Sequence, residues 1–138
     1  MIKEVQYIIV HCSATPPDMD IGVEDIRQWH REKGWSDVGY HYIIRRNGNV
    51  EKGRSDNQSG AHVRGYNSVS LGICMVGGVD DFNTPDANYT ASQWKALDKL
   101  VNDLKLTYPS AKVCGHRDMP GVDKACPCFD AISWYGED

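Results

Sequence analysis

Residues 115–130, with the sequence GHRDMPGVDKACPCFD, gather residue types that carry chemistry into one short segment. The segment contains His116, Lys124 and Cys126, and prolines and glycines interrupt it. Imidazole and thiolate groups are ligands that zinc prefers, and a thiol beside a histidine can also act as a nucleophile. Taken alone, Lys124 would be a solvated charge of the loop. The segment is therefore a candidate for metal-dependent or nucleophilic chemistry.

A second histidine, His11, occupies a matching position near the start of the chain. It ends an apolar segment that is typical of a strand, just as His116 follows a short predicted strand over 112–115. If these strands are parallel neighbours, both imidazoles lie at the sheet edge where α/β proteins tend to bind ligands. Cys126 lies further along the chain on a loop, and it can complete a three-ligand zinc site that leaves a fourth position for water.

The same residues have simpler interpretations. A histidine beside an apolar run is often a hydrogen-bonded core residue, and a cysteine is often merely buried. Another alternative is a cysteine peptidase that uses Cys12 or Cys126 with a histidine as its base. Such an enzyme would be inhibited by thiol alkylation and unaffected by chelators. Spacing alone leaves these alternatives open.

Hydrophobic periodicity and turn residues predict the elements that position these side chains. Strands are predicted over 5–12, 68–76 and 112–115, a hairpin over 40–54, and helices over 23–33, 90–108 and 131–135. The dipeptide Asn47-Gly48 favours the tight hairpin turn, and Thr90 with Gln93 has the spacing of a helix-capping box. We therefore expect an α/β fold, in which residues 1–138 form a single domain with a central mixed β-sheet flanked by helices.

Composition limits the classes of partner. Of the 138 residues, 41% are hydrophobic and 25% are charged, which is typical of a soluble globular protein. The net charge of -4 argues against a nucleic-acid partner, because phosphate binding favours a basic surface. The start of the chain resembles neither a signal peptide nor a membrane anchor, so we expect a cytoplasmic protein upon synthesis. The number of cysteines is odd, five, which argues against a disulfide framework. The sequence shows no sign of an exposed apolar stripe that could form an interface, so we expect a monomer.

Four blocks of sequence resemble one enzyme family. They are VHCSAT around His11, VGYHYII around Tyr40, AHVRGYNSVSLGICMVGG from Ala61 and KACPCFD from Lys124. These blocks are similar to the zinc-dependent N-acetylmuramoyl-L-alanine amidases of type 2, and most similar to the short phage lysozymes of the T7 type. The blocks occur in the same order as in that family, and the resemblance extends from His11 to Phe129. The peptidoglycan recognition proteins of animals are similar in fold.

The resemblance implies roles for individual residues. The metal ligands of the family fall on His11, His116 and Cys126, which implies one zinc ion (Zn2+) per chain. Tyr40 and Lys124 match the catalytic pair of the family, where a donor and a positive charge stabilise the oxyanion formed on the substrate. Zinc bound by such ligands polarises a carbonyl group and lowers the pKa of water to about 7.

His62 and Asn67, both in the HVRGYN block, match positions that line the glycan and peptide groove of the family. The implied reaction is hydrolysis of the amide bond between the lactyl group of N-acetylmuramic acid and L-alanine. The substrate is therefore expected to be peptidoglycan or a muropeptide, as for a phage or prophage endolysin.

Two alternatives remain within the resemblance. One is a peptidoglycan-binding module without catalysis, but loss of the ligand cysteine marks that state in the recognition proteins, and Cys126 is present. The other is a cytosolic amidase that recycles muropeptides. A lytic enzyme would reach the wall only after holin-type release or lysis. Some relatives contact a polymerase through their amino-terminal region, and the short amino-terminal arm of this chain does not support that contact.

The remaining histidines and cysteines are expected to be structural. Three cysteines fit buried strand positions: Cys12, Cys74 and Cys114. His30 lies on the first predicted helix, and His41 points to the opposite face of its strand from Tyr40. Cys128 lies two residues from the predicted ligand Cys126, so it either competes for the metal or packs beneath the loop.

Overall fold

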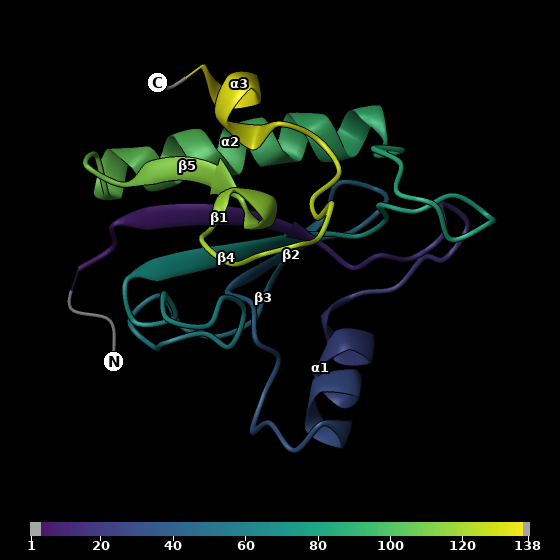
Figure 1. The fold of residues 1–138 in the computed structure, drawn as a ribbon, viewed down its shortest axis with the longest axis horizontal. Helices are drawn as coiled ribbons and strands as arrows, with labels where there is room; N and C mark the ends of the chain where they lie inside the picture. Colours follow the sequence, from purple (N-terminus) through teal and green to yellow (C-terminus); the bar gives the residue numbers. More distant parts are fainter. Residues whose placement is uncertain (1–3, 137–138) are drawn as a thin grey trace.

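The computed structural model describes residues 4–136, which form a five-stranded sheet with helices on both faces (Figure 1). In chain order the elements are β1 (Tyr7–Cys12), α1 (Val23–Glu32), β2 (Tyr42–Ile44), β3 (Val50–Lys52), β4 (Ser70–Met75), α2 (Ala91–Thr107), β5 (Lys112–Gly115), the 3-10 helix η1 (His116–Asp118) and α3 (Ala131–Tyr135). All the predicted elements are present, although β1 and β4 each begin two residues later than predicted. The outermost parts of the predicted domain, 1–3 and 137–138, lie outside the described residues.

The sheet is mixed, as predicted, with the strand order β3-β2-β4-β1-β5. Strands β2, β4, β1 and β5 run parallel, and β3 pairs antiparallel with β2 as the second arm of the hairpin. The hairpin turn falls where Asn47-Gly48 predicts it. Gly48 has a φ of +89°, which glycine adopts without strain, and its N–H donates to the carbonyl of Arg45 at 2.8 Å. The predicted fold class is confirmed.

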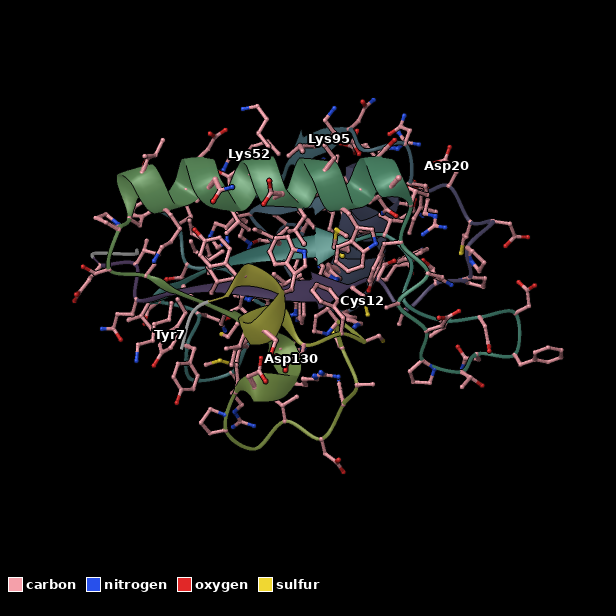
Figure 2. The ribbon with its side chains drawn as sticks, turned by 90° about the horizontal axis from the view of Figure 1, so that it is seen from above. Tyr7, Cys12, Asp20, Lys52, Lys95 and Asp130 are labelled. Carbon is pink, nitrogen blue, oxygen red and sulfur yellow. The ribbon has the colours of Figure 1, made fainter. Side chains whose placement is uncertain are left out.

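Helix α2 covers one face of the sheet and builds the larger part of the core. It lies along β1, whose two ends are marked by Tyr7 and Cys12 in Figure 2. Its buried side chains recur at helical spacing and pack against the strand side chains on the face of the sheet that α2 covers. These helix residues are Leu97, Val101 and Leu104.

The start of α2 is fixed by the predicted capping box. The Thr90 hydroxyl accepts a hydrogen bond from the N–H of Gln93 at 3.1 Å, and the Gln93 side chain accepts from the N–H of Thr90 at 3.0 Å. The Gln93 amide also donates to the carbonyls of Ile44 and Val76, at 3.2 and 2.8 Å. The cap therefore ties the helix to the ends of β2 and β4 as well as closing its own first turn.

The opposite face of the sheet is covered by α1 and by loops, and α1 lies near the carboxyl ends of the strands (Figure 1). Ile26 of α1 packs with Ile43 and Cys74 from the sheet, and Val63 from the β3–β4 connection packs with Ile9. Because side chains alternate along a strand, the face that receives Ile9 also receives the side chain two residues further along β1, which is His11.

Within residues 4–136, none of the helices has both the length and the apolar character that crossing a membrane requires.

The packing of α2 generates the first prediction. Leu97 is fully buried between α2 and the sheet, so Leu97→Ala should leave a cavity and lower the free energy of unfolding by about 2–5 kcal/mol. Leu106 lies on the same helix but is 84% exposed, so Leu106→Ala should change it by less than about 0.5 kcal/mol. Urea denaturation of both variants measures the difference. Equal losses would contradict the assignment of the buried face.

Candidate metal centre and catalytic site

The register of two strands brings the predicted histidine ligands together. Strands β1 and β5 are parallel neighbours, and Val10 pairs with Gly115. His11 and His116 directly follow this pair, so both lie at the carboxyl edge of the sheet. Their ring centroids are 4.5 Å apart. The two strands are therefore parallel neighbours, which is the condition under which the sequence predicts that both imidazoles meet at this edge.

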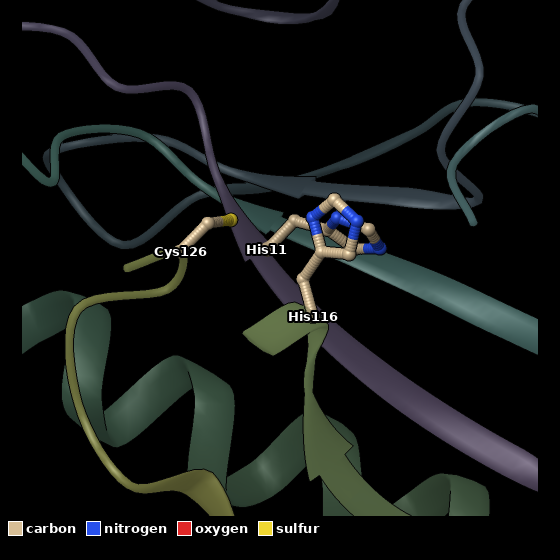
Figure 3. A group of neighbouring side chains, drawn as sticks. All are labelled: His11, His116 and Cys126. Carbon is tan, nitrogen blue, oxygen red and sulfur yellow. The ribbon is translucent and has the colours of Figure 1, made fainter. Parts of the chain in front are cut away.

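The third predicted ligand, Cys126, comes from the loop between η1 and α3. The backbone N–H of Cys12 donates to its Sγ atom at 3.1 Å, and the N–H of Arg117 donates to its carbonyl at 2.9 Å. One ligand atom from each of His11, His116 and Cys126 lies within 4.8 Å of the others. Figure 3 shows the sulfur directed toward the two imidazoles. The structure thus brings all three predicted ligands into one group.

Close packing holds this loop against the sheet. A Cβ at Gly115 would lie 2.7 Å from Cδ of Pro127, so the absence of a side chain on Gly115 lets the loop approach β5. The hydroxyl of Tyr89 donates to the carbonyl of Pro127 at 2.7 Å. The position of Cys126 therefore depends on contacts of the residue that follows it.

Burial keeps the two imidazoles of the group neutral. Burial lowers the pKa of His11 well below its ordinary value, and the nearby His62, His116 and Lys124 lower it further. Burial and the charge of Lys124 also lower the pKa of His116. A neutral imidazole keeps a nitrogen lone pair, which a metal ion needs.

The thiol of Cys126 lies beside that of Cys12. Hydrogen bonding with Cys12, together with burial, raises the pKa of Cys126 above that of a free thiol. A cation at the group of three ligands is the kind of partner that favours the thiolate of Cys126. Cys12 follows His11 in a strand and therefore points to the other face, which separates it from the imidazole that a cysteine peptidase would need as its base.

Tyr40 lies beside the metal-ligand group, in the segment that precedes β2. Its ring centroid is 5.1 Å from that of His11 and 5.5 Å from that of His30. His30 also fixes the backbone, because its Nδ1 accepts from the N–H of Gly39 at 2.8 Å. Burial raises the pKa of the Tyr40 phenol well above its ordinary value, so the hydroxyl keeps its proton and can donate a hydrogen bond.

Lys124 is exposed on the same loop as Cys126 and lines a cavity of about 530 Å³ beside the ligand group. His116 and Arg64 line the same cavity, with apolar contributions from Val63 and Val122. The positive charge of Lys124 lowers the pKa of both ligand histidines, which places it within electrostatic reach of the group.

His62 contacts a predicted ligand directly, which the sequence did not indicate. Its Nδ1 lies 2.8 Å from Nε2 of His11, a residue 51 positions away in the chain. Asn67 fixes the backbone beside it, because Oδ1 of Asn67 accepts from the N–H groups of His62 and Val63 at 2.8 and 2.9 Å. The place of His62 and Asn67 in a glycan and peptide groove stays a prediction.

The remaining cysteines and histidines have structural contacts. Cys12, Cys74 and Cys114 are buried in strands as predicted, and all five cysteines are free thiols. Cys128 lies outside the group of three ligands, and its Sγ donates to the carbonyl of Gly78 at 3.1 Å. It therefore packs beneath the loop, which was one of its two predicted roles.

His41 links the hairpin to its surroundings. Its Nδ1 accepts from the N–H of Gly72 at 3.0 Å, and its Nε2 lies 2.7 Å from the carbonyl of Gln58. Both ring nitrogens thus contact backbone groups, as a structural role requires.

Comparison with known proteins supports the resemblance. The endolysin of Enterobacteria phage K11 is 52% identical over 132 residues, which cover 96% of this chain and 86% of that protein. The endolysin of Escherichia phage T7 is 48% identical over 128 residues, with coverage of 93% and 83%. The solved structure of a variant of Drosophila PGRP-LB in complex with tracheal cytotoxin is similar with a TM-score of 0.78 at 25% identity, covering 96% of this chain and 80% of that one.

A match over most of the chain identifies the family. Residues 2–129 match the protein family described as N-acetylmuramoyl-L-alanine amidase, and this range contains the whole group of three metal-ligand candidates. The chain therefore belongs to the N-acetylmuramoyl-L-alanine amidase family.

Proposed function

We propose that this chain is a zinc-dependent endolysin-type amidase that hydrolyses the amide bond between the lactyl group of N-acetylmuramic acid and L-alanine in peptidoglycan. The observation that carries the proposal is the convergence of His11, His116 and Cys126 to within 4.8 Å of one another in a chain of this family. We propose as well that residues 1–138 form a single amidase domain.

The chemistry of the three donors fits one zinc ion. Two neutral imidazoles and one thiol form a nitrogen and sulfur ligand set that zinc prefers, and three protein ligands leave a position open for catalysis. Zinc held by such a set supplies polarisation of a carbonyl group and activation of water at neutral pH.

Tyr40 and Lys124 are proposed to act on the substrate amide. As the carbonyl carbon is attacked, negative charge develops on its oxygen. The Tyr40 hydroxyl, which keeps its proton because burial raises its pKa, donates a hydrogen bond to that oxygen. Lys124, exposed at the rim of the cavity beside His116, supplies a positive charge to the same oxygen.

The substrate class follows from the relatives. The similar phage proteins are endolysins, and the similar Drosophila protein binds tracheal cytotoxin. We propose peptidoglycan or its fragments as the substrate, a monomer as the working form, and cytoplasmic synthesis followed by holin-type release or lysis.

Digestion of purified peptidoglycan tests the activity. The protein should release new amino groups of alanine without new reducing ends of sugars, because the lactyl amide is cut and the glycan is not. A chelator should abolish the release, and added zinc should restore it.

Three other results of this digestion would contradict the proposal. Cleavage that persists with chelator and stops with a thiol-alkylating reagent would indicate a cysteine peptidase. Sedimentation with the wall without new amines would indicate a binding module. Cleavage of soluble muropeptides but not of intact wall would indicate a recycling enzyme.

Removing either member of the proposed catalytic pair should lower activity while zinc stays bound. Tyr40→Phe and Lys124→Ala should each reduce kcat by about 100-fold or more, because each removes stabilisation of the oxyanion. Steady-state kinetics measures the reduction, and metal analysis of the purified variants measures retained zinc.

Matched variants control for general effects of these changes. Tyr42→Phe removes a hydroxyl that bonds Asp56, away from the metal-ligand group, and Lys95→Ala removes an exposed charge of α2. Both should keep wild-type kcat. Full activity of Tyr40→Phe or Lys124→Ala would refute the role of that residue.

Zinc binding should depend on Cys126 and not on its neighbour Cys128. Zinc at about 100 times its Kd stabilises a folded protein by about 2.7 kcal/mol, so it should raise the Tm of the wild type. Cys126→Ser should abolish this increase, whereas Cys128→Ser should keep it, because the Cys128 thiol donates to Gly78 instead. Thermal unfolding with and without zinc measures both, and the reverse pattern would overturn the choice of ligand.

A further inference from the structure

A chain of hydrogen bonds leads from the backbone of the β3–β4 connection to the ligand candidate His11. The Ser70 hydroxyl donates to the carbonyl of Tyr66 at 2.7 Å, and its Oγ also lies 3.2 Å from Nε2 of His62. On the other side of the ring, Nδ1 of His62 lies 2.8 Å from Nε2 of His11. Both nitrogens of His62 are therefore engaged within the protein.

The direction of each bond follows from the number of protons available. A carbonyl only accepts, so the single proton of the Ser70 hydroxyl goes to Tyr66, and Oγ must accept from Nε2–H of His62. A neutral imidazole carries one N–H, so Nδ1 of His62 is bare and accepts from Nε2–H of His11. The only lone pair that His11 then offers is that of Nδ1.

The position of the His62 ring is itself fixed. Asn67 holds the backbone through two accepted N–H bonds, and Ser70 is fully buried at the start of β4. Two glycines leave space for the ring, since a Cβ at Gly72 would lie 2.8 Å from its Cγ and one at Gly60 would lie 2.5 Å from its Cδ2. The ring therefore has little freedom to turn.

We propose that Ser70 and His62 are positioning residues that set the tautomer of His11, so that Nδ1 of His11 faces the metal. The proposal rests on the metal site proposed above and concerns residues that do not touch the ion. Ligand histidines commonly donate their second N–H to a neighbouring acceptor, which orients the ring and raises its basicity. Here the acceptor is another imidazole, anchored by a serine.

This role differs from the groove position that the sequence resemblance implies for His62 and Asn67. Because both nitrogens of His62 are bonded to protein atoms, neither is left to bind a sugar or a peptide. Asn67 then acts by holding the backbone of His62 in place.

The tautomers can be read directly from the wild-type protein. Long-range ¹H–¹⁵N correlation spectra of the histidine rings, recorded with and without zinc, should show both His11 and His62 protonated at Nε2. With zinc, the Nδ1 resonance of His11 should shift. A proton on Nδ1 of His62, or a metal-induced shift at Nε2 of His11, would overturn the proposal.

Variants measure the contribution to metal binding by competition with a chelator of known zinc affinity. His62→Phe removes the acceptor and should weaken zinc binding by about 10–100-fold. His62→Asn places an amide oxygen near the position of Nδ1 and should recover part of this loss. Ser70→Ala removes the hydroxyl beside Nε2 of His62 but keeps the Ser70 backbone, which also hydrogen bonds His62, so it should weaken binding less than His62→Phe does.

His41→Phe is the matched control. His41 is a buried histidine beside the His62 ring and makes two hydrogen bonds, but neither of them involves His11. The variant should keep the zinc affinity of the wild type. Unchanged zinc affinity in folded His62→Phe, or a raised KM as its only defect, would refute positioning and favour the groove. The tautomer and zinc-affinity measurements need no substrate, so failure of the proposed amidase activity would show separately, as wild-type protein that binds zinc but releases no alanine amines.

Discussion

Parallel pairing of β1 with β5 is the constraint on which the site depends. The pairing of Val10 with Gly115 puts the residue after each of them at the same sheet edge, and these residues are His11 in β1 and His116 at the start of η1. A slip of one residue in either strand would send its histidine to the opposite face, toward the hydrophobic core under α2. The apolar side chains that fix this register therefore also position the two imidazoles, whose ring centroids are 4.5 Å apart.

The register also separates the two kinds of work that β1 does. Ile8, Val10 and Cys12 face the core built by α2, while His11 faces the side covered by α1 and the β3–β4 connection. His11 and His41 can be buried on that second face because each has a hydrogen-bond partner there. Burial in turn holds the pKa of the imidazoles low, and it strengthens electrostatic interactions with any charge that enters the site.

The loop that carries Cys126 and Lys124 has little regular structure, so its position depends on individual contacts. The N–H of Cys12 donates to the sulfur of Cys126, the N–H of Arg117 donates to the carbonyl of Cys126, and the hydroxyl of Tyr89 donates to the carbonyl of Pro127. These contacts join β1, η1 and the segment before α2 to one loop. Lys124 on the same loop is exposed, which suits the substrate contact proposed for it.

Local sequence determined the elements and the types of chemistry. Apolar runs, the Asn47-Gly48 turn and the Thr90 cap are local signals, so the strands, the hairpin and α2 could be predicted, and family motifs identified the three ligand candidates. Tertiary structure alone decided that His62 contacts His11 and that Cys128 bonds Gly78 instead of joining the group of three. These contacts join residues far apart in the chain. Their geometry is set by sheet register and loop packing, which no local spacing of residues encodes.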